Sequence, residues 1–213
     1  MRQELTYAPG AASQRSGLRS RGLFGALGLR PAIALHTPAE GAMLRHYAEG
    51  ARCLVEIGVA EGTSAWELRH AADPAGSLYL IDPYLPGRIP GLNMARIVAR
   101  RLLGGQDGVR PVWIQDFSHE ASLGWDDSID FLLIDGDHSY EGVSRDWQDW
   151  SPHVRPGGIV ALHDARVFDS GWVEPSDGPV RLRESIERGG APGWEVMDGV
   201  DSLAIVRRAK GPV

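Results

Sequence analysis

Acidic and imidazole side chains gather at the ends of two apolar segments. Asp135, Asp137 and His138 follow one apolar run, and His163 and Asp164 follow the next one. If the two runs are adjacent parallel strands, all five side chains meet at the carboxyl edge of the sheet, where ligands bind in open α/β folds. One acid at a strand end often only caps the next helix, but five such groups together favour a functional site. An imidazole titrates at about 6.5, so this site could transfer protons near neutral pH.

A second group of residues has the features of a nucleoside-binding loop. The apolar run 53–57 predicts a buried strand that ends in a glycine loop, with Gly58 and Gly62, before a helical stretch begins at Thr63. Glycine is needed where a strand turns sharply into a helix and the backbone approaches a ligand closely. Twenty residues after Gly62, another apolar run ends at Asp82, which is placed to accept hydrogen bonds from a ribose.

The spacing of the glycines argues against a dinucleotide ligand. A dinucleotide site uses Gly-x-Gly-x-x-Gly, in which the third glycine packs the helix against the sheet to seat a pyrophosphate. This loop has one glycine fewer, and Glu56 stands just before it. A carboxylate there would repel a pyrophosphate but would suit a cationic ligand.

Alternating strand and helix signals indicate the elements that must position these residues. Thr37, Pro38 and Glu40 form a helix start with an N-cap, a proline at the first helical position and a capping-box acid. This helix is expected to end at Gly50. The sequence then predicts strands at 52–57, 77–82, 109–115, 129–135 and 159–163, and helices at 63–72, 92–103, 139–150 and 179–188. Strands that alternate with helices imply a parallel sheet covered on both faces.

The C-terminal segment follows a different pattern. Residues 194–198 and 202–206 are two short strand-like runs, and Gly199, Val200 and Asp201 separate them. This arrangement predicts an antiparallel hairpin.

The composition is that of one globular domain preceded by a basic arm. The chain has 213 residues, of which 43% are hydrophobic and 23% charged, which suits one well-buried domain. Residues 1–30 contain five arginines and one glutamate, so they are expected to form a flexible basic arm, and residues 31–213 the folded domain. The single cysteine, Cys53, lies in an apolar run and is expected to be a small hydrophobe rather than a reactive thiol.

Charge and hydropathy argue against some partners. The net charge of −6 argues against nucleic acid as the main partner, and no stretch approaches the ~20 apolar residues of a membrane span. The N-terminus is a poor match to a signal peptide, so a cytoplasmic protein is expected. The basic arm is a candidate surface for homo-oligomer formation.

Taken together, these segments resemble a known enzyme family. The glycine loop and the acid before it resemble the cofactor loop of class I S-adenosylmethionine-dependent methyltransferases, whose ligand carries a sulfonium and an ammonium group and has no phosphate. Segments 134–143, 156–158 and 161–164, which read IDGDHSYEGV, PGG and ALHD, are similar to the metal-dependent O-methyltransferase branch that includes sugar O-methyltransferases. The resemblance covers residues 50–165. It implies a Rossmann-like three-layer α/β sandwich with a mostly parallel seven-stranded sheet that ends in an antiparallel hairpin.

The resemblance also implies a cofactor site and a metal site. The residues that would contact S-adenosyl-L-methionine are Glu56, Ile57, Gly58, Gly62, Thr63, Ser64, Asp82, Asp116, Phe117 and Asp135. A divalent metal would be held by Asp135, His163 and Asp164. An all-oxygen shell favours Mg²⁺, whereas an imidazole ligand favours Mn²⁺ or a similar ion. His163 departs from the acid usual in the family, so it either binds the metal or packs beneath the site.

On the acceptor side, His138 matches the general base of the sugar-modifying members. Residues that would contact the substrate are Asp137, Tyr140, Tyr84, Arg88 and Trp172. Trp172 could stack on a sugar face or only anchor its loop.

The sequence therefore predicts an S-adenosylmethionine-dependent O-methyltransferase that acts on a hydroxyl of a sugar or saccharide metabolite. The metal would act as template and Lewis acid, and His138 would remove the proton. Three alternatives remain: an O-methyltransferase of a non-sugar natural product, a nicotinamide-dependent oxidoreductase on a similar sheet, and a catalytically silent cofactor-binding or assembly protein. The missing third glycine, Glu56 and the hairpin argue against the oxidoreductase.

Overall fold

A computed structural model describes most of the chain beyond the N-terminal arm. The described residues are 6–7, 27, 31–86, 92–105, 107–169 and 171–211. Only residues 6–7 and 27 of the expected arm are among them, and Arg88 lies outside them. The roles expected for the arm and for Arg88 therefore stay predictions.

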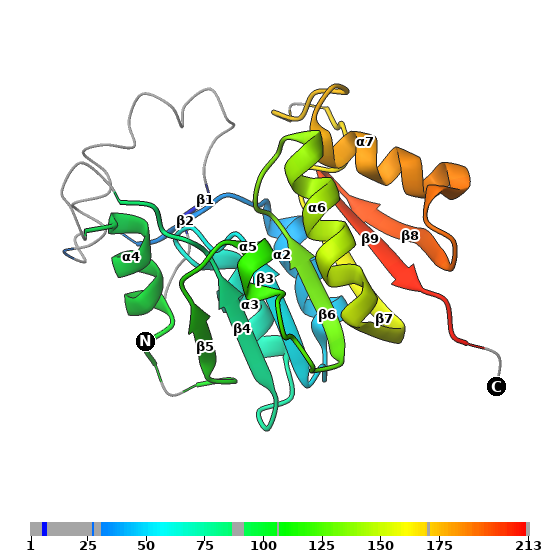
Figure 1. The fold of residues 1–213 in the computed structure, drawn as a ribbon. Helices are drawn as coiled ribbons and strands as arrows, with labels where there is room; N and C mark the ends of the chain where they lie inside the picture. Colours follow the sequence, from blue (N-terminus) through cyan, green and yellow to red (C-terminus); the bar gives the residue numbers. More distant parts are fainter. Residues whose placement is uncertain are drawn as a thin grey trace.

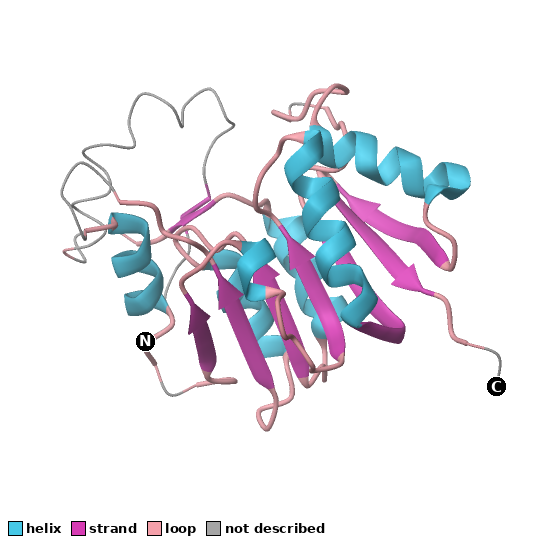
Figure 2. Cartoon of the chain, in the orientation of Figure 1, coloured by secondary structure: helices cyan, strands magenta, loops and turns pink. Residues whose placement is uncertain are grey.

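A seven-stranded sheet forms the middle layer of the protein (Figures 1 and 2). Its strand order is β5-β4-β3-β6-β7-β9-β8. Parallel pairing joins β5 (Pro111–Ile114), β4 (Ser77–Ile81), β3 (Cys53–Ile57), β6 (Ile129–Ile134) and β7 (Val154–Leu162). The strand β9 (Leu203–Arg208) pairs antiparallel with both β7 and β8 (Trp194–Val200). The predicted fold class, with its closing hairpin, is confirmed.

Helices cover both faces of the sheet because its central strands are apolar on both faces. On one face, α2 (Pro38–Ala48), α3 (Thr63–Ala71) and α4 (Met94–Leu102) share a core with Phe131 of β6. On the other, α6 (Tyr140–Trp150) and α7 (Gly178–Ser185) share a core with Leu132. Neighbouring strand residues point to opposite faces, so one apolar run supplies both cores. Figure 1 shows α6 in front of the sheet and α2 behind it.

Local signals set where the helices begin. In α2, the Glu40 amide donates to Thr37 Oγ1 at 3.1 Å and the Thr37 amide donates to Glu40 Oε2 at 2.7 Å, which is the expected capping box. Ser139 caps α6 by accepting from the Gly142 amide at 3.0 Å. These caps hold the start of α6 directly after the acidic segment that follows β6.

Some boundaries differ from the predicted ones. The strand β7 begins at Val154 rather than 159, because the Pro-Gly-Gly segment stays extended and passes a register irregularity beside β6. The last helix ends at Ser185 and continues as a π-helical segment, η3 (Ile186–Gly190). The hairpin turns at Asp201 and Ser202, one step later than expected, because Asp201 adopts a left-handed backbone with φ 47°.

Four short elements were not predicted, because they are too short to show a period. They are the parallel pair β1 (Thr6–Tyr7) and β2 (Ile33–Ala34), the single turn α5 (Ser118–Ala121) and the 3₁₀ turn η2 (Ser151–His153). The strand β2 matters for the site, because the Ile33 amide donates to Glu61 Oε2 in the glycine loop at 2.8 Å.

Cys53 is half-buried at the start of β3. Burial raises the pKa of its thiol to about 12, and the charges of Asp127 and Asp130 act in the same direction. The thiol is therefore held in its unreactive protonated form.

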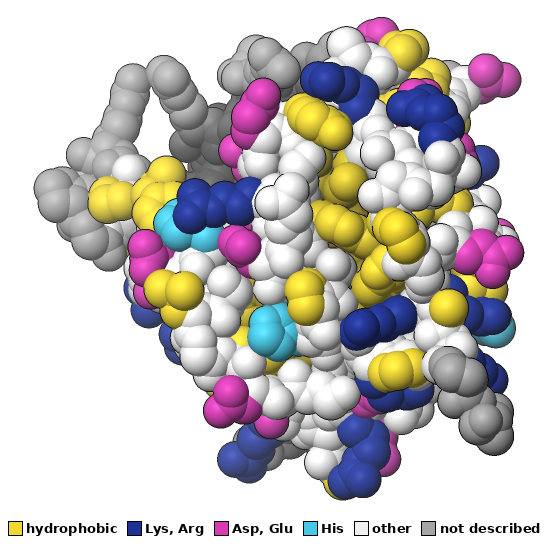
Figure 3. Space-filling view, turned by 45° about the vertical axis from the view of Figure 1, so that its right-hand side comes forward, with side chains coloured by type: hydrophobic (Ala, Val, Ile, Leu, Met, Phe, Trp, Pro, Cys, Tyr) yellow, Lys and Arg dark blue, Asp and Glu magenta, His cyan; other side chains and the backbone are white. Residues whose placement is uncertain are grey.

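The surface mixes charges of both signs. On the face in Figure 3, Lys, Arg, Asp and Glu side chains surround a band of hydrophobic side chains. None of the helices in the described part of the chain combines the length and apolar character that crossing a membrane requires.

Candidate active site

A cleft of about 890 Å³ lies at the carboxyl ends of the central strands. It is the position at which open α/β sheets bind ligands. Most of the predicted site residues line it, namely Ile57, Gly58, Asp82, Phe117, Asp135, Asp137, His138, His163, Asp164 and Trp172. The two predicted groups of residues therefore share one cleft.

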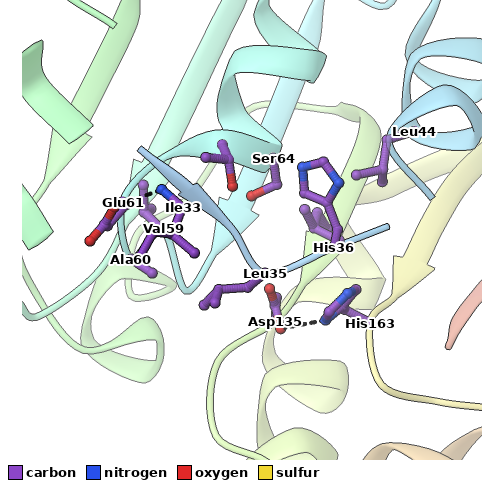
Figure 4. A pocket seen from close by; sticks show the side chains of 12 residues that line it. Ile33, Leu35, His36, Leu44, Val59, Ala60, Glu61, Ser64, Asp135 and His163 are labelled. Carbon is purple, nitrogen blue, oxygen red and sulfur yellow. Dashed lines mark hydrogen bonds and ion pairs between the residues drawn. The ribbon is translucent and has the colours of Figure 1, made fainter. Parts of the chain in front are cut away.

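A small cavity of about 20 Å³ lies beside the glycine loop (Figure 4). The predicted residues Thr63 and Ser64 line it, together with Asp135 and His163, which also line the large cleft. Figure 4 shows the side chains of Asp135 and His163 pointing toward one another, with Leu35 of the segment after β2 beside them. A cavity of this size holds about one water molecule.

The glycine loop is shaped by contacts within the protein. Gly58 has φ 84°, and a Cβ there would lie 2.1 Å from the backbone oxygen of Asp135. Gly62 has φ 80°, and its Cβ would meet the side chains of Ala99 and Leu103 at 3.2 Å, so it faces α4. Both positions require glycine for the fold itself.

Asp82 holds the loop in place at the tip of β4. Its Oδ2 accepts from the amides of Val59 and Ala60 at 3.0 and 3.1 Å, and its Oδ1 accepts from the Tyr84 amide at 2.7 Å. Each carboxylate oxygen has two lone pairs, so Asp82 can still accept from a ligand in the cleft that it lines.

Glu56 lies beneath the loop rather than facing the cleft. It is 0% exposed, and the Ser64 hydroxyl donates to its Oε1 at 2.5 Å. Its Oε2 has no hydrogen-bond partner among the described residues. Burial, reinforced by the charges of Asp135 and Asp82, raises the pKa of Glu56 to about 8. The sequence-based view of Glu56 as a charged group that attracts a cationic ligand does not fit this buried position.

His163 sits between three carboxylates and is 5% exposed. Its Nδ1 is 3.1 Å from Asp135 Oδ1 and 3.5 Å from Asp164 Oδ1, and its Nε2 is 3.5 Å from Glu40 Oε2. Burial alone would lower the pKa of His163, but these carboxylates outweigh it and raise the pKa well above its usual value. The ring therefore favours the charged form.

Glu40 is the buried partner on the far side of that ring. Its Oε1 accepts from the amide and hydroxyl of Ser202 at 2.8 and 2.6 Å. Burial would raise the pKa of Glu40, but His163, Ser202 and Thr37 outweigh this effect and lower it to about 2. The sequence identified Glu40 only as a capping acid and missed its link to the site.

His138 is exposed on the cleft side of the acids. Its Nε2 lies 3.5 Å from Asp135 Oδ1 and its Nδ1 lies 3.5 Å from Asp164 Oδ2, with 48% of the side chain exposed. The interaction with Asp135 is the main cause that raises the pKa of His138. Unlike His163, this ring can reach a ligand in the cleft.

The donors at this edge fit a divalent metal. Asp135, His138 and Asp164 each offer one ligand atom, and these atoms lie within 4.8 Å of one another. This grouping has His138 where the sequence-based set had His163. The Nδ1 of His163 is turned toward Asp135 and its Nε2 toward Glu40. Of the two roles that the sequence allowed for His163, this geometry favours packing beneath the site over binding the metal.

On the side of β5, Phe117 lines the cleft and is 48% exposed. Asp116 is exposed and is not among the described residues that line the cleft; its Oδ1 accepts from the Phe117 amide at 2.9 Å.

Asp146 of α6 was missed by the sequence reasoning, yet it is 4% exposed and lines the cleft. An acid within the apolar stripe of Val143, Trp147 and Trp150 was the signal that could have found it.

The predicted substrate residues divide into two groups. Trp172 lines the cleft and its Nε1 donates to Asp164 Oδ1 at 2.8 Å, so its loop is tied to the acidic group. Asp137 lines the cleft and accepts from the Ser139 amide at 2.8 Å. Tyr84 is 6% exposed, with its hydroxyl 3.3 Å from the Ala60 oxygen, and the Tyr140 ring packs under Arg181. Neither tyrosine is among the described residues that line the cleft.

Comparisons with known proteins agree with this geometry. The solved structures that share the fold include two O-methyltransferases. The O-methyltransferase from Bacillus cereus in complex with SAH is 18% identical with a TM-score of 0.62, and 90% of each chain is covered. The O-methyltransferase TomG from Streptomyces achromogenes in complex with SAM is 16% identical with a TM-score of 0.59, and the match covers 89% of this chain and 88% of that one.

Among curated proteins, the uncharacterized protein y4gI from Sinorhizobium fredii is 28% identical over 126 residues, which are 57% of this chain and 14% of that protein. The chain spans less than a fifth of the length of the curated relatives it matches.

The family comparison is the most direct. Residues 55–165, more than half of the chain, match the family model of the methyltransferase domain. This match disfavours a nicotinamide-dependent oxidoreductase, in agreement with the glycine spacing. The chain belongs to the methyltransferase-domain family.

Proposed function

We propose that the protein is an S-adenosyl-L-methionine-dependent O-methyltransferase that acts on a hydroxyl of a sugar or saccharide metabolite. The observation that carries the proposal is that Asp135, His138 and Asp164 open into the same cleft as the glycine loop and Asp82. A cofactor on the loop would thus place its methyl group beside an acid and imidazole group.

In this proposal, Asp82 accepts hydrogen bonds from the ribose and Phe117 packs against the adenine. Asp135 and Asp164 hold a divalent metal, Mg²⁺ or Mn²⁺. When bound, the ion supplies a Lewis acid that orients the acceptor hydroxyl. Holding the oxygen, the methyl carbon and the sulfur in line supplies much of the rate.

His138 is the proposed general base. It stands 3.5 Å from one oxygen of each acid, so its ring is within reach of a hydroxyl held between them. The proton of the hydroxyl passes to the imidazole as the oxygen takes the methyl group. The sulfonium is itself a strong electrophile, so no covalent enzyme intermediate is needed.

The aromatic surface of Trp172 supports a ring-shaped acceptor. Trp172 lines the cleft, and its indole, which donates to Asp164, could stack on the face of a sugar. The same surface suits the hydroxyl of a non-sugar natural product; TomG, which shares the fold, is involved in tomaymycin synthesis. Asp137 would then contact the acceptor from the loop after β6.

The test is a screen of saccharide and phenolic acceptors with methyl-labelled cofactor, with and without EDTA. We expect label in a saccharide, and loss of transfer after chelation that returns with added Mg²⁺ or Mn²⁺. Full turnover of the chelated enzyme would exclude the metal, and labelling of phenols alone would exclude the sugar. Binding of the cofactor without transfer to any acceptor would favour a silent cofactor-binding protein.

A further inference from the structure

Asp164 has an uncommon backbone conformation at the tip of β7. Its φ is 51°, in the left-handed region that residues other than glycine rarely adopt. Its side chain is buried and lines the cleft. A conformation of this kind costs free energy and persists only where the surrounding structure fixes it, which happens most often at functional sites.

Hydrogen bonds directly after Asp164 hold this backbone. The Ala165 amide donates to the Ser202 carbonyl oxygen at 2.9 Å, and the Arg183 Nε donates to the Ala165 carbonyl oxygen at 2.8 Å. The β8–β9 turn and α7 thus both hold the chain where it leaves β7. With the backbone fixed, the direction of the Asp164 carboxylate depends on its side-chain torsions alone.

The two oxygens of the Asp164 carboxylate face different partners. Oδ1 accepts from the Nε1 of Trp172 at 2.8 Å and lies 3.5 Å from the Nδ1 of His163, whereas Oδ2 lies 3.5 Å from the Nδ1 of His138. The bond from the indole is the shortest of these three contacts. It keeps Oδ1 on the side of Trp172 and leaves Oδ2 on the side of His138, where the candidate metal donors converge.

The indole that makes this bond is itself held by neighbouring residues. The rings of Phe168 and Trp172 meet edge to face, with their centroids 5.6 Å apart. A Cβ built on Gly171 would lie 2.3 Å from the Phe168 ring, so a side chain at that position would disturb this pair. Val173, the next residue, is buried. The N–H of Trp172 is therefore in place to donate to Asp164.

We propose that Trp172 is a positioning residue whose indole N–H orients the Asp164 carboxylate for binding the divalent ion. This inference rests on the proposed function, since it takes Asp164 as a metal ligand. Groups that hydrogen-bond to metal ligands typically change metal affinity by about 10- to 100-fold. The bond uses only the edge of the indole, so the face of the ring stays available for stacking on an acceptor.

The experiment removes the N–H of Trp172 and keeps the ring. With β-(3-benzothienyl)alanine at position 172, sulfur replaces the N–H in a ring of nearly the same shape, and Trp172→Phe is the simpler companion variant. Calorimetry of the full chain with Mg²⁺ and with Mn²⁺, without acceptor, should show binding weakened by about 10- to 100-fold in both variants. Trp194→Phe, at the start of β8 and not among the described residues that line the cleft, should keep the wild-type affinity.

The remaining roles of Trp172 give different results. If the indole only anchors its loop, denaturant midpoints fall in both variants while the ion binds as in wild type, and the inference is overturned. If the ring only stacks on the acceptor, Trp172→Phe raises the acceptor KM and the benzothienyl variant behaves as wild type, which also overturns it.

Turnover gives an independent readout of the same proposal. In the benzothienyl variant, kcat should fall at a limiting concentration of the ion and recover as that concentration is raised, with little change in the acceptor KM. A loss of kcat that no concentration of the ion restores would contradict the proposal. If the wild type bound neither Mg²⁺ nor Mn²⁺, the metal of the proposed function would fail, whereas wild-type binding that both variants retain would exclude only the role of Trp172.

Discussion

At the residue scale, the two histidines of the site have different surroundings although both follow strand ends. His163 is 5% exposed and is enclosed by Asp135, Asp164 and Glu40, whereas the His138 side chain is 48% exposed in the cleft. The enclosed ring of His163 is the less accessible of the two to a substrate. In the proposed function, proton transfer is therefore assigned to His138, and His163 is suited to fixing the two acids.

Replacing His138 should separate chemistry from binding. His138→Ala should lower the single-turnover rate by roughly 10²–10⁴-fold, the usual contribution of acid–base catalysis. His138→Gln keeps hydrogen bonding but cannot accept the proton, so it should be nearly as slow. Calorimetry should show cofactor affinity unchanged in both variants, and Mg²⁺ or Mn²⁺ affinity unchanged as well. A lost metal affinity would instead make His138 a ligand, and a wild-type rate in His138→Ala would remove it from the mechanism.

Glu56 should make stability depend on pH. Its folded-state pKa is raised from 4.5 to about 8 by burial and by Asp135 and Asp82, against the opposing effects of Ser64 and His163. The folded protein thus holds this proton more tightly than the unfolded chain, so its contribution to stability is present below pH 4.5 and is lost as pH rises to about 8. Glu56→Gln should remove that loss, on the order of a few kcal/mol at pH 8.

The measurement is urea unfolding of wild type and Glu56→Gln between pH 5 and 9. The excess in free energy of unfolding of Glu56→Gln over wild type should grow as the pH rises to about 8 and then level off. An excess that does not change with pH would mean that Glu56 has the same pKa in the folded and the unfolded protein. Glu61→Gln, in the loop that follows the buried strand of Glu56, serves as the control.

At the element scale, the glycine loop is set by how β3 meets β6. A side chain at Gly58 would strike the Asp135 backbone before it met any ligand, since its Cβ would lie 2.1 Å from that oxygen. Substitution of Gly58 therefore tests the packing of two strand tips and cannot serve as a selective test of cofactor binding. Asp82, whose carboxylate lines the cleft, is the cleaner position for that purpose.

Gly58→Ala should destabilise the protein more than Gly50→Ala. Both residues have a left-handed backbone, with φ 84° and 70°, but nothing lies within 4 Å of a Cβ at Gly50. The Gly50 variant then reports backbone strain of about 1–2 kcal/mol, and the Gly58 variant should lose about 1–3 kcal/mol more through overpacking. Denaturant midpoints give both values, and equal losses would contradict the contact.

At the scale of the whole molecule, Glu40 joins three distant parts of the chain. It completes the capping box of α2, accepts from Ser202 in the β8–β9 turn, and lies 3.5 Å from the His163 ring beneath the site. The turn of the hairpin that closes the sheet is thereby connected to the acids at the strand tips, which lie at the same edge of the sheet. Such a fully buried group is expected to affect both stability and catalysis.

Glu40→Ala should lower both stability and turnover. Loss of a buried carboxylate with several partners should cost about 3 kcal/mol or more, and His163 would lose the group opposite Asp135. The matched control is Thr37→Ala, which removes the helix cap for about 1 kcal/mol but leaves Glu40 beside His163. Turnover per folded molecule should fall in Glu40→Ala and hold in Thr37→Ala. An equal effect on turnover in the two variants would reduce Glu40 to a capping residue.

Much of the fold follows from local patterns that the sequence displays. Thr37 and Glu40 mark a helix start by chemistry confined to one turn, and the apolar runs at β3 and β6 mark strands whose two faces are both buried. Because parallel strands end at one edge, the order of elements also places Asp82, Asp135 and Asp164 in one cleft. These features need no knowledge of tertiary contacts.

The class of fold, the methyltransferase family and the residues at the strand tips could all be predicted from the amino-acid order. The burial of Glu56 under its loop, the contact of Glu40 with His163 and the position of Asp146 rather than Asp116 at the cleft emerge only in the folded chain. This is because periodicity and capping are set by neighbours in the chain. The environment of a carboxyl is set by whichever elements pack on it, and Glu40 meets Ser202 from 162 residues away.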